Sequence, residues 1–264
     1  MRRVLLRTIA LGYLAVLLIG PLSIVFYRAF EHGIGPAWNA VTTPEALHAF
    51  KMTLMIAAIA VPANTLFGIL CALVIVRHPL PGKGVLNALV DLPLALSPVV
   101  VGLSLFLLYG RTGWFGSWFS GHGIQILFAL PSMILATIFV SLPFVVREVV
   151  PVLREIGTDQ EQAAATLGAS EWQIFRRITL PAIRWAVAYG VVLTSARSLG
   201  EYGAVAVVSG RIAGRTETAT LYVNDRYDAF DLVGAYSASV VLALMAVSVL
   251  MAMKLLKPKE GVNK

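Results

Sequence analysis

The sequence is poor in charge, cysteine and histidine. Of its 264 residues only 13% are charged and 58% are hydrophobic, whereas a typical soluble domain is about 25% charged. The single cysteine, Cys71, excludes a disulfide within the chain, and the four histidines are scattered without the spacing of metal ligands. The composition therefore predicts a membrane protein with several spans.

Motifs that mark common enzymes are also missing. The sequence contains no H-E-x-x-H, no G-x-S-x-G and no Walker A phosphate loop. Glu201 is the only carboxylate within a predicted span, so no pair of carboxylates is available there for acid–base catalysis. We therefore expect no catalytic site, no metal and no bound cofactor in this chain.

Long apolar runs dominate the chain instead. A helix needs about 20 apolar residues to cross a bilayer, and six segments approach that length. The predicted fold is an all-α polytopic membrane protein, formed as a single domain over residues 1–264. Pro93 and Pro98 lie in the third segment, and Pro98 is expected to kink it. The predicted spans are residues 8–27, 53–76, 92–109, 126–146, 185–209 and 233–253.

The basic residues predict the orientation of these spans. Lysine and arginine gather on the cytoplasmic side of membrane proteins. With the N-terminus inside, 14 of the 21 basic residues fall in inner segments, 6 fall in outer segments, and Arg197 lies within the fifth span. Both termini are therefore predicted to be cytoplasmic. The net charge of +7 follows from this bias and does not indicate nucleic-acid binding.

The last outer segment, residues 210–232, is rich in charges of both signs. A solvated loop and a docking surface for a soluble partner outside the membrane both fit this pattern. The two interpretations stay open.

One polar segment, residues 158–181, separates the fourth and fifth spans and carries too many charges to cross a membrane. Thr158 and Glu161 have the spacing of a capping box, which predicts a first short helix beginning there. Gly168 suits the left-handed position that ends such a helix. The charge bias places this segment in the cytoplasm.

A second short helix is predicted in the same segment. Ser170 and Gln173 repeat the capping-box spacing, and Pro181 is expected to end the helix. Trp172 and Phe175 lie within it. These two aromatic side chains contact either a partner protein or the spans of this chain, and the sequence does not decide between them.

The fifth span contains Arg197 and Glu201, one helical turn apart on the same face. Charges inside spans usually face each other or a cavity. One interpretation is a structural ion pair. The other is a substrate pathway in which Arg197 attracts an anion, with Ser195 and Ser198 beside it.

The polar segment resembles the cytoplasmic loop of ABC importer permeases. That loop reads Glu-Ala-Ala, three residues, Gly, nine residues and Ile-x-Leu-Pro. The alanines at 163–164, Gly168 and the run at 178–181 match this spacing. Gln162 stands at the glutamate position, and Glu161 lies one residue earlier.

Other segments are similar to the sulfate/thiosulfate branch of this family of binding-protein-dependent inner-membrane permeases. They are residues 92–102, 142–153 and 184–210. Within the last of these, residues 201–210 resemble the W-type permease subunit more than its T-type partner. The similarity covers roughly residues 50–255.

The resemblance implies a type I ABC importer permease in the cytoplasmic (inner) membrane, translocating sulfate or thiosulfate without an ATPase site of its own. ATP and Mg would bind to separate ABC ATPase subunits. The other implied partners are a T-type permease, an extracytoplasmic sulfate-binding protein and membrane lipid. Alternatives are a permease for molybdate or tungstate, or an ATP-independent carrier or channel. The implied ATPase-coupling residues are Glu161, Gln162, Ala163, Ala164, Gly168, Ala169 and Trp172.

Overall fold

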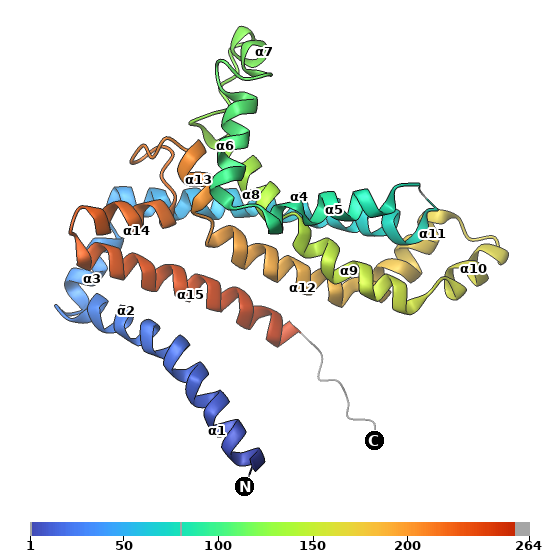
Figure 1. Cartoon of the computed structure of the whole chain (residues 1–264), viewed down its shortest axis with the longest axis horizontal. Coiled ribbons are helices and arrows are strands. Elements are labelled where there is room, and N and C mark those ends of the chain that lie inside the picture. The colour runs from blue at the N-terminus through green and yellow to red at the C-terminus, as the bar shows by residue number, and fades with distance from the viewer. Residues whose placement is uncertain (1, 80, 257–264) are drawn as a thin grey trace. The chain divides into compact units, whose positions relative to one another are not determined.

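The computed structural model describes residues 2–79 and 81–256. Residues 1, 80 and 257–264 lie outside the described residues, and with them most of the C-terminal basic tail counted above. The described residues form helices joined by turns, without a β-strand, which confirms the all-α class (Figure 1). They divide into two compact units. Among the described residues, the first comprises 2–52 and 212–245, and the second comprises 53–79, 81–211 and 246–256.

Within the described residues, five helices are long and apolar enough to cross a membrane, and a bent pair of shorter helices supplies a sixth crossing if it counts as one span. This agrees with the expectation of about six spans. The five helical stretches are Leu6–Phe30, Pro44–Arg77, Leu130–Ile156, Glu171–Leu199 and Leu232–Ala252.

The first unit has a small core around Tyr222. Its hydroxyl donates a hydrogen bond to the carbonyl of Ala40 at 3.3 Å, and small side chains such as Ala46 and Ala219 pack beside it. The predicted outer segment 210–232 therefore contains a packed helix, α14. The helices that contribute to this unit are α1 (Arg2–Leu14), α2 (Gly20–Phe30), α3 (Ile34–Val41), α14 (Ala219–Asp228), the beginning of α4 (Pro44–Arg77) and most of α15 (Leu232–Leu256).

The second unit is built on α9 (Pro143–Ile156) and α12 (Leu180–Leu199), which lie side by side (Figure 1). Gly190 permits this approach, because a Cβ there would lie 2.8 Å from the Cα of Val145. The buried core around Leu153 joins both helices to the last turns of α4. The other helices of this unit are α5 (Lys83–Ala95), α6 (Pro98–Tyr109), α7 (Gly116–Gly121), α8 (Leu130–Ser141), α10 (Asp159–Thr166), α11 (Glu171–Ile174) and α13 (Gly203–Val208).

The third predicted span, residues 92–109, is not one kinked helix. Helices α5 and α6 meet at an angle of 110° across a break at Leu96 and Ser97. Both residues are extended, with ψ of 141° and 137°. The ring of Pro98 disfavours the helical conformation at the preceding residue, and Pro98 then occupies the first turn of α6. The proline therefore separates two helices.

The region of the fifth predicted span, residues 185–209, also differs from the expectation. Helix α12 ends at Leu199, and the short α13 follows a break at residues 200–202. At its beginning, Pro181 does not end a helix, because one helical stretch continues from Glu171 to Leu199. A π-helical turn over Phe175–Thr179 precedes the proline, and its wider hydrogen bonding accommodates the ring at the start of α12.

Candidate functional site

The polar segment 158–181 folds as two helical pieces joined by a tight turn. Helix α10 lies between two glycines with left-handed φ, Gly157 at +64° and Gly168 at +83°. At α11 the Ser170 side chain accepts a hydrogen bond from the backbone of Gln173, whose side chain accepts one from the Ser170 backbone. The predicted capping box at this helix and the left-handed glycine are confirmed.

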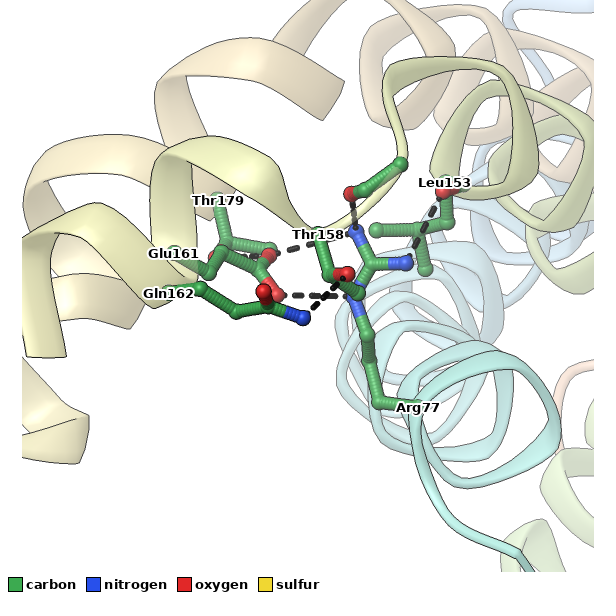
Figure 2. A network of polar contacts seen from close by, with 7 residues as sticks. Arg77, Leu153, Thr158, Glu161, Gln162 and Thr179 are labelled. Atoms are coloured by element: carbon green, nitrogen blue, oxygen red, sulfur yellow. Dashed lines mark hydrogen bonds and ion pairs between the residues drawn. The ribbon is translucent and has the colours of Figure 1, made fainter.

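The other predicted capping box is wrong. Thr158 precedes α10, but its side chain does not cap the helix backbone. Its hydroxyl instead accepts a hydrogen bond from the Gln162 side chain at 2.9 Å (Figure 2). Glu161 turns away to Arg77 at the end of α4, and the pair has an Nε–Oε2 distance of 2.9 Å. A cation 84 residues earlier in the chain competes successfully for this carboxylate.

Arg77 is the centre of a polar network that joins four parts of the second unit. Its Nη1 donates to the carbonyl of Leu153 at 3.0 Å, and its Nη2 donates to the carbonyl of Gly157 at 2.7 Å. The same Nη2 donates to Oε1 of Glu161 at 3.2 Å. That Oε1 also accepts from the hydroxyl of Thr179 at 2.8 Å (Figure 2). The network links the ends of α4 and α9 to α10 and to the π-helical turn.

The segment presents apolar side chains to its surroundings. Leu167, at the tip of the turn, is 89% exposed, and Trp172 is 67% exposed while its ring lies 5.6 Å from that of Phe175. Gln162 and Ala163 are exposed, whereas the neighbouring Ala164 and Ala169 are half-buried. Leu167 and Trp172 are therefore free of the core of this chain and accessible to another molecule.

Gly168 is required by its backbone conformation. A Cβ at this position would meet no atom of this chain within 4 Å, so close packing inside the chain is not the reason for glycine. A left-handed φ disfavours residues that carry a Cβ.

Arg197 and Glu201 form an ion pair with an Nη2–Oε2 distance of 2.8 Å, as the structural interpretation expects. Glu201 is buried, and its Oε1 accepts a hydrogen bond from the backbone of Ala204 at 2.8 Å, so it also holds the start of α13. Ser195 and Ser198 each donate to a carbonyl one turn earlier in α12. An anion pathway along these four residues stays a prediction.

Residues 110–125, which include α7, border a cavity of about 550 Å³. Aromatic side chains line it, including Phe106 and Phe119, together with Arg111 and Gln125. It lies outside both predicted sites.

The sequence pattern does not single out three residues of segment 158–181 and its support. Arg77 is one of several basic residues at the predicted inner ends of spans. Thr179 and Leu167 occupy variable positions of the motif. Position next to a helix-ending glycine could have indicated Leu167, whereas the contact between Arg77 and Glu161 has no local signal.

Comparison with protein families matches residues 64–261 to the family described as "Binding-protein-dependent transport system inner membrane component". The chain is 49% identical to the "Sulfate transport system permease protein CysW" of Synechocystis sp., covering 98% of this chain and 94% of that protein. It is 48% identical to the protein of the same name in Escherichia coli K12, covering 88% of this chain and 80% of that protein. The "Sulfate transport system permease protein CysT" of E. coli K12 is 39% identical, covering 89% and 87%.

The fold is also found in a solved transporter. A chain in the crystal structure of a bacterial ABC transporter involved in the import of the acidic polysaccharide alginate superimposes with a TM-score of 0.81 at 19% identity. The match covers 97% of this chain and 95% of that chain. The matched family model and the extent of these similarities together show that the chain belongs to the family of binding-protein-dependent transport system inner membrane components.

Proposed function

We propose that this chain is a permease subunit of an ATP-driven ABC importer that carries sulfate or thiosulfate across the cytoplasmic membrane. The observation that carries the proposal is its 49% identity to a sulfate transport system permease over nearly the whole of both chains. Identity to the T-type relative is lower, at 39%, which supports a W-type subunit that pairs with a separate T-type permease.

The energy source is proposed to be a separate ATPase that binds ATP and Mg, because the sequence has no Walker A loop. Segment 158–181 is the proposed contact. Its exposed Leu167 and Trp172 can enter a groove on the ATPase, a common mode of helix recognition. The implied coupling residues Glu161 and Gln162 lie on the same segment. A soluble sulfate-binding protein is the proposed partner on the outer side of the membrane.

Uptake of radiolabelled sulfate tests this function in cells that lack their own sulfate importers. The chain would be produced together with its ATPase, T-type permease and binding protein, with and without an inactivating substitution in the ATPase. We expect uptake that requires an active ATPase and that falls when unlabelled thiosulfate is added.

Two other outcomes would contradict the proposal in different ways. Competition by molybdate or tungstate far stronger than that by thiosulfate would indicate a permease for a different oxyanion. Uptake that persists with the inactive ATPase would indicate a carrier or channel.

A further inference from the structure

Helix α10 is not anchored by apolar burial. The structure describes this helix in full, and none of its eight residues is buried. Its flanking glycines, Gly157 and Gly168, both have left-handed φ. An element without buried side chains needs specific polar contacts to keep one position relative to its neighbours. In α10, Glu161 supplies contacts of this kind.

The contact between Arg77 and Glu161 is directional. Arg77 Nη2 donates a hydrogen bond to Oε1 at 3.2 Å, and Nε lies 2.9 Å from Oε2 as an ion-pair contact without hydrogen-bond geometry. The side chains are only 13% and 18% exposed, so water screens the pair weakly. The guanidinium therefore holds Glu161 by one hydrogen bond and one ion-pair contact while its other hydrogen bonds fix its own position.

The cation of this pair is tied to the rigid core of the second unit. Arg77 also donates to the carbonyl of Leu153, whose side chain is completely buried among α4, α9 and α12. Thr179 binds the same carboxylate from the turn that leads into α12. A displacement of α10 is therefore transmitted through Glu161 to the inner ends of three long helices.

We propose that Arg77, Glu161 and Thr179 form a clamp that positions the coupling segment and transmits its movement to the spans. The proposal rests on the proposed function. In this account Glu161 acts inside the chain through Arg77, and the ATPase is contacted by the exposed residues beside it. The three are positioning residues. Substituting them leaves the ATPase bound and hydrolysing ATP but reduces the sulfate transported for each ATP hydrolysed.

The test measures sulfate imported per ATP hydrolysed in proteoliposomes that contain the whole complex. Arg77→Gln and Glu161→Gln are each expected to lower this ratio by about fivefold or more, within the range of coupling between sites. Because both substitutions break the same clamp, the ratio in the double variant should be no lower than the ratio in the more strongly affected single variant. Amounts of copurified ATPase should stay at the wild-type level.

Two further variants probe the geometry. Arg77→Lys should be as uncoupled as Arg77→Gln, because one ammonium group cannot contact the Glu161 carboxylate and both backbone carbonyls together. Thr179→Val keeps the shape and the ion pair, so it gives a milder loss of about twofold and remains informative if the charge variants fold poorly. The matched control is Glu31→Gln, which breaks the exposed Arg28–Glu31 pair of 2.9 Å and should change nothing.

The clamp would be overturned if the losses of the two single variants multiplied in the double variant, so that its ratio of sulfate imported to ATP hydrolysed fell below that of either. A wild-type ratio in Glu161→Gln or in Arg77→Lys would also overturn it. Loss of the ATPase from the Glu161→Gln complex would also overturn it, since Glu161 would then be a direct contact. Failure of the proposed function would look different. The wild-type complex itself would show no ATP-dependent sulfate import.

Discussion

At the scale of single residues, Arg197 near the end of α12 and Glu201 in the break after it form an ion pair within the fifth predicted span. Glu201 is buried and binds both Arg197 and the backbone of α13. Removing one partner of a buried pair leaves the other charge uncompensated, at a cost of about 3–5 kcal/mol, whereas removing both charges is often tolerated.

We therefore predict that Arg197→Ala strongly reduces the amount of folded protein and that adding Glu201→Gln largely restores it. Size-exclusion chromatography of the detergent-extracted complex measures this. A double variant no better than the single variant would contradict the structural role. Uptake assayed in the folded double variant then examines the anion pathway, because an essential Arg197 would leave uptake low despite normal folding.

Glu217 predicts a pH dependence of stability in the first unit. The side chain is only 4% exposed, and its burial raises its pKa from 4.5 to about 7. The nearby carboxylates Asp225 and Glu45 contribute to the rise, and Arg226 opposes it. The folded state then holds a proton that the unfolded state releases, so the contribution of Glu217 to stability is fully present below pH 4.5 and is lost as the pH rises through 7.

The expected loss between pH 4.5 and 7 is up to about 3 kcal/mol, from 1.36 kcal/mol for each pKa unit. Thermal unfolding of the purified protein between pH 5 and 8 checks this against Glu217→Gln. The variant, which cannot ionise, should lose less stability than the wild type as the pH rises. Parallel curves for the two proteins would exclude a buried titrating Glu217.

At the scale of elements, the turn between α10 and α11 depends on backbone conformation. A left-handed residue with a Cβ costs about 1–2 kcal/mol, but asparagine tolerates this region better than other residues. No atom of this chain lies near the missing Cβ of Gly168. Substitutions there should consequently rank by backbone preference.

We expect ATPase copurification to fall in the order Gly168, Gly168→Asn, Gly168→Ala, Gly168→Val. Pull-down of the ATPase through a tag on the permease measures the series. Gly84→Ala is the control, since Gly84 lies in helix α5 with open space around it and normal helical φ. Equal binding by the Asn and Val variants would show that the left-handed conformation does not matter for docking.

Local signals in the sequence predicted some elements of this segment and failed at others for identifiable reasons. The capping box of Ser170 and Gln173 is confirmed because its partners are three residues apart and no other group competes. Glu161 has the same spacing from Thr158 but meets Arg77, which only the packing of α4 against α9 brings near. Pro98 breaks its span at 110°, whereas Pro181 is absorbed by a π-helical turn, and the bare presence of proline does not separate these outcomes.

At the scale of the whole molecule, the proposed orientation places segment 158–181 inside and α7 outside. Single cysteines test this after replacement of the buried Cys71 by alanine. Leu167 and Trp114 are both highly exposed, so a cysteine at either position should be reactive. We predict that a membrane-impermeant maleimide labels Trp114→Cys in intact cells and labels Leu167→Cys only after permeabilisation. Labelling of Leu167→Cys in intact cells, with Trp114→Cys labelled only after permeabilisation, would show that the topology is the opposite of the proposed one.

The claim of an ATP-driven sulfate permease is tested most directly by accumulation of radiolabelled sulfate in proteoliposomes. The complex would be oriented with segment 158–181 inside and the binding protein added outside, with ATP and Mg enclosed or omitted. We predict that sulfate accumulates above its external concentration only when ATP is enclosed and the binding protein is present. Sulfate that merely equilibrates, at the same rate with and without ATP, would contradict it.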